Sequence, residues 1–248
     1  MTTPPDHFSA VANDYANFRP DYPPALFDWL KAHCPNGNAV WDVGCGSGQA
    51  SVALAKRFAT VHATDISAEQ IANAPQRSNI HYRVAPAEQS SFADASIDLV
   101  TVAQALHWFD VPRFHDEVKR VLKPGGLLAE WTYSPIRLEN ATLNAILQRF
   151  YVEVATPWWP PGREHVENGY AQLPFPFARL PDPGFAIQRE MTLPQLIGYV
   201  RSWSAMSRYI SANKTDPTPQ LATELAQAMG SEEKIAVSWL LKLRAGYR

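Results

Sequence analysis

The sequence VWDVGCGSGQ, residues 40–49, decides the fold of this chain. Its apolar beginning, preceded by Ala39, predicts a buried parallel β-strand. Three glycines follow at alternate positions, Gly44, Gly46 and Gly48, and helix-compatible residues come after them. Glycine permits a backbone with positive φ and lets a ligand lie close to the main chain. The stretch therefore predicts a strand, a tight turn and a helix, with a nucleoside site beyond the carboxyl end of the strand.

Two common nucleotide-binding patterns do not fit this turn. A dinucleotide fingerprint needs glycine or alanine three positions after Gly48, where the chain has Ser51. The Gly-Lys-Ser/Thr of a P-loop is absent from the turn. Asp42 comes just before the glycines, and a carboxylate there would repel phosphate but favour an ammonium or sulfonium ligand. An NAD site and a purely structural glycine turn remain as alternatives.

The stretch from Asp42 to Gly48 resembles the first motif of the class I S-adenosylmethionine (SAM)-dependent methyltransferases, Asp/Glu-x-Gly-x-Gly-x-Gly. A second resemblance is Leu-Lys-Pro-Gly-Gly at residues 122–126, between a predicted helix over 111–121 and an apolar run. Membership of this family would imply SAM as the cofactor and methyl transfer as the reaction. It would also imply a Rossmann-like sheet whose last strand is antiparallel to its neighbours.

The order of apolar runs and helical patterns predicts an α/β fold. We expect a Rossmann-like, mostly parallel sheet of seven strands with helices on both faces and a helical cap in the C-terminal half. Further helices are expected over residues 138–154, 193–206 and 219–229, and the proline- and tryptophan-rich residues 156–161 are expected to form a loop of the cap.

We predict a single domain over residues 1–248, with 46% hydrophobic residues to form its core. Its expected segments are N-terminal helices that cover the cofactor (1–36), the SAM-binding core (37–133), a cap or substrate insertion (134–184), and the end of the sheet with its helices (185–248).

Asp65 is the clearest candidate for recognising a ribose. It follows the β-prone run 60–64, about twenty residues after the start of the turn, where a carboxylate at a strand tip can accept both ribose hydroxyls. The alternative is that Asp65 caps the next helix. Ser67 is expected to supply that cap, with Gln70 in the capping-box position, so Asp65 is not needed for it.

The resemblance implies further contacts to the cofactor. Residues 12–23 resemble the Ala-x-x-Tyr and Arg-Pro-x-Tyr-Pro segment of a subgroup that includes the trans-aconitate methyltransferase-like enzymes, in which Arg19 would bind the methionine carboxylate. The same residues could instead be helix packing and a surface charge. The complete expected cofactor set is Tyr15, Arg19, Asp42, Gly44, Gly46, Gly48, Asp65, Ile66, Ala87, Glu88, Gln104, Ala105 and Trp108.

His107 is the candidate catalytic residue, because it comes directly after the fourth predicted strand. A histidine there could act as a general base for a hydroxyl or amine acceptor, whereas a carboxylate acceptor would need no base. His107 could also be an ordinary polar residue at the rim or one that orients the cofactor. Glu130 is a weaker candidate base, and no spacing of residues predicts a metal site.

The composition of the chain limits the kinds of binding partner that we expect. The net charge is −2, with no run of basic residues, and the Asn/Asp-Pro-Pro-Tyr/Phe motif of nucleic-acid methyltransferases is absent after the fourth strand, so we expect no nucleic acid. No apolar run is long enough to span a membrane, and two cysteines without a framework favour the cytoplasm. The expected partner is a small molecule with a carboxylic acid or hydroxyl group. The alternative is a SAM-binding regulatory module without turnover.

Overall fold

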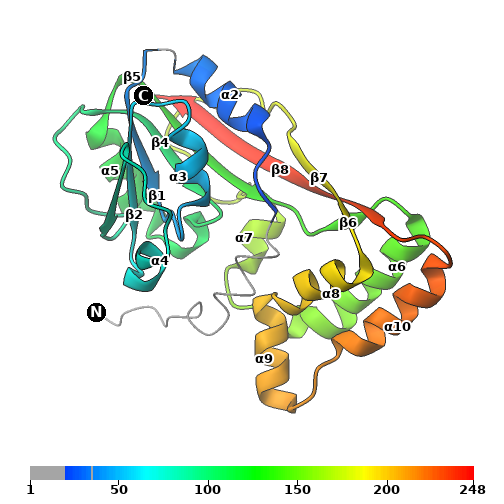
Figure 1. Ribbon diagram of the computed structural model, residues 1–248. Coiled ribbons are helices and arrows are strands. Elements are labelled where there is room, and N and C mark those ends of the chain that lie inside the picture. The colour runs from blue at the N-terminus through cyan, green and yellow to red at the C-terminus, as the bar shows by residue number, and fades with distance from the viewer. Residues whose placement is uncertain (1–19, 35) are drawn as a thin grey trace. The chain divides into compact units, whose positions relative to one another are not determined.

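A computed structural model describes residues 20–34 and 36–248 (Figure 1). These residues form two compact units. The sheet unit comprises residues 21–134, 164–186 and 240–248, and the helical unit comprises residues 20, 135–163 and 187–239 of the described chain. The functional candidates after Pro20 all lie in the sheet unit, so the two units are described separately.

The sheet unit contains a Rossmann-like sheet with the strand order β3-β2-β1-β4-β5-β8. The first five of these strands are parallel, and β8 is antiparallel to β5. The prediction of a mostly parallel sheet with an antiparallel last strand is therefore confirmed. The strands are β1 (Ala39–Val43), β2 (Thr60–Asp65), β3 (Ile80–Val84), β4 (Ile97–Ala103), β5 (Leu122–Tyr133) and β8 (Ile235–Tyr247).

Two further strands pair with β8, which gives eight strands where the sequence predicted seven. One is β7 (Ala186–Met191), and the other is β6 (Arg137–Leu138). A strand of two residues is too short to produce a period-two hydrophobic pattern, so β6 could not be found from the sequence.

Helices cover both faces of the sheet. Neighbouring residues of a strand point in opposite directions, so each strand supplies side chains to the contacts on both faces. Trp41 of β1 packs against Phe114 of α5, with ring centroids 6.3 Å apart. The next residue, Asp42, points the other way and binds Ser51 of α3. Helices of the sheet unit include α2 (Pro24–His33), α3 (Gln49–Leu54), α4 (Ala68–Ala72), the 3₁₀ helix η2 (Leu106–Trp108) and α5 (Val111–Val121).

Helix α5 shows why the sequence predicted this layer correctly. Its apolar residues Phe114, Val118 and Val121 recur at helical spacing, and all three are fully buried in the core of the sheet unit. Asp110 caps the helix by accepting a hydrogen bond from the Arg113 N–H at 3.4 Å. The predicted bounds, 111–121, are those of the structure.

The helical unit differs from the prediction in two places, where a predicted helix is divided in the structure. The expected helix over 138–154 is α6 (Ala141–Phe150) followed by a π-helix, η3 (Tyr151–Ala155). The expected helix over 193–206 is divided into α8 (Leu193–Arg201) and α9 (Ser204–Asn213). Apolar spacing predicts that residues are helical but does not reveal where the hydrogen-bonding pattern changes.

Further helices among the described residues are α7 (Arg163–Glu167), nearly all of which belongs to the sheet unit, α10 (Thr218–Met229) and the 3₁₀ helix η4 (Thr156–Trp158). Helix η4 occupies part of the segment that was expected to be a loop. Its proline, Pro157, stands in the first turn of the helix, where the missing N–H would have had no helical partner. Helix α10 packs against α6 and α8, and its Leu221 and Leu225 are buried.

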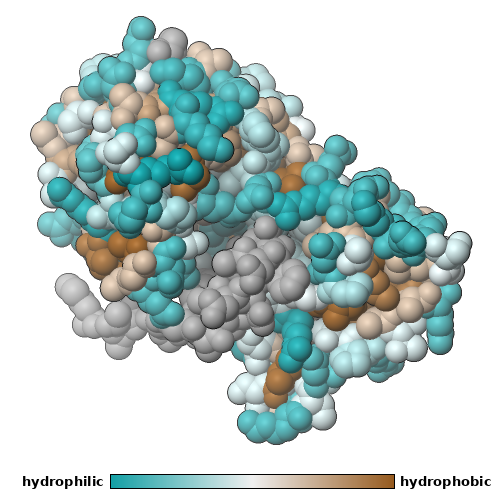
Figure 2. All heavy atoms as spheres, viewed as in Figure 1, coloured by the Kyte–Doolittle hydropathy of each residue, from teal (hydrophilic) through white to brown (hydrophobic). Residues whose placement is uncertain are grey.

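On the face shown in Figure 2, hydrophilic residues are interspersed with hydrophobic ones, which gather in several separate places. Among the residues that the structure describes, no helix is both long and apolar enough to cross a bilayer.

Candidate active site

The glycine turn joins β1 to α3 in the sheet unit. Gly44, Gly46 and Gly48 have φ angles of 64°, 54° and 83°, so all three adopt left-handed backbone conformations. A side-chain carbon at Gly48 would collide with the hydroxyl of Tyr82, whereas one at Gly46 would have, among the residues that the structure describes, only Gln70 Oε1 within 4 Å, at 3.8 Å. As far as these residues go, the backbone at Gly46 is therefore open on the side where a ligand could lie.

Asp65, the last residue of β2, stands beside this open position. Its Oδ2 accepts a hydrogen bond from the Gly46 N–H and its Oδ1 accepts one from the Ser67 N–H, each at 2.8 Å. The carboxylate is only partly buried, and each oxygen keeps a further lone pair for ribose hydroxyls. The Ser67 hydroxyl accepts from the Gln70 N–H at 3.3 Å, so Ser67 caps α4 as predicted.

Asp42 lies beneath the turn and is fully buried. The hydroxyls of Ser51 and Thr101 donate to its two oxygens at 2.5 Å and 2.8 Å. Burial raises the pKa of Asp42, and these two hydrogen bonds oppose the rise, with a result of about 6. Asp42 therefore joins β1, α3 and β4 behind the turn, and any contact of its own with the cofactor stays a prediction.

The segment after β4 lies directly against the glycine turn. A side-chain carbon at Gly44 would be 2.6 Å from the Ala105 side chain, which is itself buried. Gln104 adopts a left-handed conformation with φ of 58°, and its Oε1 accepts a hydrogen bond from the Thr132 hydroxyl at 2.6 Å. His107 and Trp108 follow in η2, and His107 is half-buried.

Three large apolar side chains are exposed near the carboxyl ends of β2, β3 and β4. Ile66 directly follows β2 and is 62% exposed, and Val84 ends β3 and is 55% exposed. Trp108, after β4, is 41% exposed. Since the strands are parallel, these ends share one edge of the sheet, where an adenine ring could be covered by apolar surface.

The two residues expected beside the adenine have structural contacts of their own. Ala87 is buried in the core of the sheet unit. Glu88 is half-buried, and its Oε1 accepts a hydrogen bond from the Asp110 N–H at 2.9 Å, which ties the loop after β3 to the start of α5. Their role toward the cofactor remains a prediction.

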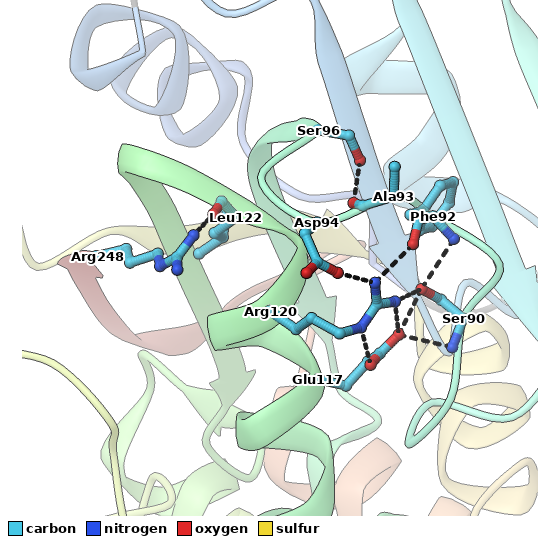
Figure 3. A network of polar contacts seen from close by, with 9 residues as sticks. All are labelled: Ser90, Phe92, Ala93, Asp94, Ser96, Glu117, Arg120, Leu122 and Arg248. Carbon is cyan, nitrogen blue, oxygen red and sulfur yellow. Dashed lines mark hydrogen bonds and ion pairs between the residues drawn. The ribbon is translucent and has the colours of Figure 1, made fainter.

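Helix α5 also holds the next part of this loop through Glu117 and Arg120 (Figure 3). Glu117 Oε1 accepts from the N–H and the hydroxyl of Ser90 at 2.8 Å and 2.6 Å. Arg120 Nη1 donates to the Phe92 carbonyl at 2.8 Å and to Asp94 at 2.7 Å. Burial raises the pKa of Glu117, but hydrogen bonds from Arg120 and Ser90 outweigh it and lower the pKa to about 2.

A buried group of charges that the sequence analysis missed lies in the same unit. Glu130 is fully buried, and Arg244 donates to its Oε2 from Nε at 3.1 Å. Glu130 Oε1 lies 2.7 Å from Nε2 of His115. Arg244 also donates from Nη1 to the carbonyls of Tyr170 and Leu173, at 2.6 Å and 2.8 Å. Full burial in this ion pair removes Glu130 from the role of a general base.

Tyr15 and Arg19 lie outside the described residues, so their predicted cofactor contacts stay predictions. Within residues 20–34 and 36–248, no group of three His, Cys, Asp or Glu side chains could hold a metal ion.

Comparisons with known proteins agree with this geometry. A family described as "Methyltransferase domain" matches residues 41–129, from β1 to β5. A Dictyostelium discoideum protein named as a methyltransferase is 33% identical over 226 residues, which cover 90% of this chain and 86% of that protein. The 2-methyl-6-phytyl-1,4-hydroquinone methyltransferase of Synechocystis is 36% identical over 171 residues, or 65% of this chain and 53% of the relative.

The fold is also found in a solved structure from Anaeromyxobacter dehalogenans that is described as a type II methyltransferase. It superposes with a TM-score of 0.87 at 41% sequence identity, and the match covers 93% of this chain and 98% of that one. With the open glycine turn and the carboxylate of Asp65 beside it, these similarities establish the cofactor as SAM: the chain belongs to the class I SAM-dependent methyltransferases.

Proposed function

We propose that this methyltransferase acts on a small molecule and methylates a hydroxyl or a carboxyl group. The chain carries a net charge of −2, which does not favour binding to the phosphate backbone of a nucleic acid. The Synechocystis relative is named for a hydroquinone, a small phenolic molecule. A carboxylic acid is the acceptor that the resemblance of the N-terminal segment to trans-aconitate methyltransferase-like enzymes suggests.

The residues at the carboxyl edge of the sheet fit the proposed cofactor. Asp65 would accept hydrogen bonds from the ribose, the main chain at Gly46 would contact the ligand, and Ile66 would cover the adenine. SAM supplies a methyl group on a sulfonium, which is a strong electrophile. The protein then has to align the acceptor with the methyl group and keep water away.

The observation that carries the proposal is the position of His107 and Trp108. They follow Ala105, which contacts the glycine turn at Gly44, and they lie at the edge of the sheet that carries Asp65. The exposed indole offers an aromatic face to a positive charge, and the imidazole offers a base to a hydroxyl acceptor. Both belong to the chemistry of methyl transfer to a small molecule.

Two measurements test this proposal. Isothermal titration with SAM and with S-adenosylhomocysteine establishes binding, and methyl transfer from radiolabelled SAM is then screened against phenols, alcohols, carboxylic acids, amines and total RNA. Transfer to a phenol, an alcohol or a carboxylic acid supports the proposal. Transfer to RNA alone would overturn it, and tight binding without transfer to any acceptor would favour a SAM-binding module that does not turn over.

A further inference from the structure

Thr132, which no sequence pattern singled out, binds a candidate cofactor residue from the neighbouring strand. It is fully buried near the end of β5, and its hydroxyl donates to Gln104 Oε1 at 2.6 Å. The N–H of Gln104 donates to the carbonyl of Trp131, the residue before Thr132, at 2.9 Å. Two adjacent residues of β5 therefore hold Gln104, one by its side chain and the other by its main chain.

The backbone at Gln104 is held in a conformation that side chains rarely permit. Its φ is 58°, in the left-handed region. Three other non-glycine residues of the described chain share this feature: Ala95, which precedes β4, and Tyr170 and Lys214, which follow helices. Gln104 alone among these four directly follows the carboxyl end of a parallel strand. Such strain persists only where its surroundings impose it, and it is concentrated at ligand sites.

Gln104 also lies where the order of the strands reverses. From β1 the chain first extends the sheet to β2 and β3, and then to β4 and β5 on the other side of β1. In open sheets of this kind the ligand crevice lies outside the carboxyl ends of the two strands at the reversal, here β1 and β4. Gln104 directly follows β4, and the next residue, Ala105, contacts the glycine turn at Gly44.

The hydrogen bond from Thr132 fixes the direction of the Gln104 amide. Oε1 and Nε2 are bonded to the same carbon and point apart, so an Oε1 held by Thr132 directs Nε2 away from the Thr132 oxygen. Gln104 is half-buried, and no described residue accepts a hydrogen bond from its Nε2. The amide therefore presents a neutral donor for which the described protein supplies no acceptor.

The geometry of the sheet indicates which part of SAM this donor meets. Neighbouring strands lie about 4.8 Å apart, so the tips of β2 and β4, on either side of β1, are about 10 Å apart. With the ribose at Asp65 on β2, the methionine part of SAM extends across β1 toward Gln104. Its sulfonium and ammonium groups are cations that do not accept from an amide N–H. Its carboxylate only accepts, and it forms stronger hydrogen bonds than a neutral group does.

We propose that Gln104 donates a hydrogen bond from Nε2 to the methionine carboxylate of SAM, and that Thr132 is the positioning residue that holds the amide for this contact. The inference rests on SAM as the cofactor and does not depend on the acceptor. Arg19 is expected from the family resemblance to bind the same carboxylate. The two carboxylate oxygens have lone pairs for both donors.

Calorimetry with two ligands tests the contact. One is SAM, and the other is decarboxylated SAM, which has a hydrogen in place of the carboxylate. Q104M keeps the length of the side chain and removes the amide, and we expect it to weaken SAM binding by about 10-fold or more. Its affinity for decarboxylated SAM should stay at the wild-type value. Q104E should weaken SAM binding further, because it places a negative charge beside the carboxylate, and should not weaken binding of the decarboxylated ligand.

A pair of variants at position 132 tests the positioning role. T132S keeps the hydroxyl and should bind both ligands as the wild type does. T132V releases the amide and should weaken SAM binding by less than Q104M does, again without an effect on decarboxylated SAM. A purely structural role would weaken both ligands alike. Q76M is the matched control, because Gln76 is an exposed glutamine of the sheet unit that donates to the Ala74 carbonyl.

Three outcomes would overturn the inference. They are an unchanged SAM affinity in Q104M, an equal loss of affinity for both ligands in Q104M, and a wild-type protein that binds decarboxylated SAM as tightly as SAM. The last of these needs no variant, so it decides even if Q104M does not fold. A wild-type protein that bound neither ligand would overturn the assignment of SAM as well. The acceptor screen of the proposed function is a separate measurement, since neither ligand needs an acceptor in order to bind.

Discussion

The Gly46 N–H donates a 2.8 Å hydrogen bond to the Asp65 carboxylate and so joins the glycine turn after β1 to the tip of β2. The other carboxylate oxygen is held by the Ser67 N–H, also at 2.8 Å. Two backbone donors therefore fix the carboxylate without help from any ligand. A group that is already in place loses less entropy when the ligand binds, which favours affinity.

Replacing Asp65 by alanine should weaken SAM binding. The loss of charged hydrogen bonds to the ribose is expected to cost roughly 1.5–3 kcal/mol, or about 10- to 150-fold in the dissociation constant. Isothermal titration measures the change. D116A is the matched control, because Asp116 is an exposed carboxylate on α5 that pairs with Lys119. Equal affinities of wild type and D65A would remove Asp65 from the site.

Gly46 offers a test of where the ligand lies. An alanine there would suffer left-handed strain of roughly 1–2 kcal/mol, and its methyl group would occupy the open side of the turn. We expect G46A to fold and to lose most of its SAM affinity. G125A is the control, because Gly125 has φ of 76° and no atom of the described residues lies within 4 Å of an added side-chain carbon. Loss of stability without loss of affinity in G46A would place the ligand elsewhere.

Much of this site could be predicted because its signals are local. The glycine turn and Asp65 belong to neighbouring parallel strands, so their strand ends had to meet at one edge of the sheet. Helix α5 followed from apolar spacing alone. The burial of Asp42 was harder to predict, because its environment depends on the hydroxyls of Ser51 and Thr101 from two other elements.

The contacts of Arg244 with Glu130 and with the Tyr170 carbonyl could not be predicted from local pattern. Arg244 and Glu130 are 114 residues apart, and Arg244 and Tyr170 are 74 apart. One signal was present: the apolar end of β5 carries Glu130, the apolar run of β8 carries Lys242 and Arg244, and the charges of the two strands have opposite sign. Opposite charges in two buried strands predict a buried pair, although not the carbonyls that the arginine also binds.

Breaking the buried pair should destabilise the protein strongly. E130Q removes the negative charge and leaves the buried guanidinium of Arg244 uncompensated, which typically costs about 3–5 kcal/mol. Urea unfolding measures the free energy of unfolding. E190Q is the control, because the Glu190–Lys234 pair at 3.2 Å is exposed and its loss should change stability little. An E130Q protein as stable as the wild type would contradict a stabilising role for the buried Glu130–Arg244 pair.

The Glu117 network predicts sensitivity to acid. The pKa of Glu117 is lowered from 4.5 to about 2 in the folded protein, so its stabilising contribution is present above pH 4.5 and is lost as the pH falls toward 2. E117Q should lower the free energy of unfolding at pH 7 by about 2 kcal/mol. The deficit relative to wild type should shrink below pH 4.5. D116N, at an exposed neighbour on the same helix, should show no such dependence.

Asp42 predicts the opposite pH dependence within the same unit. Its pKa is raised from 3.8 to about 6 because the carboxylate is fully buried, so the folded protein holds this proton more tightly than the unfolded chain does. The stability that results is fully present below pH 3.8 and is lost as the pH rises through about 6. The difference between the two pKa values corresponds to about 3 kcal/mol in the free energy of unfolding.

An asparagine at position 42 has nearly the same shape and does not titrate, so it isolates this effect. The free energy of unfolding of D42N relative to wild type should rise by about 3 kcal/mol between pH 4 and pH 7, and the difference should be constant at higher pH. E117Q serves as the internal comparison, since its difference from wild type has the opposite slope and ends by pH 4.5. Parallel stability curves for D42N and wild type over this range would show that Asp42 keeps an ordinary pKa, and that the turn contains solvent or a counter-charge beside it.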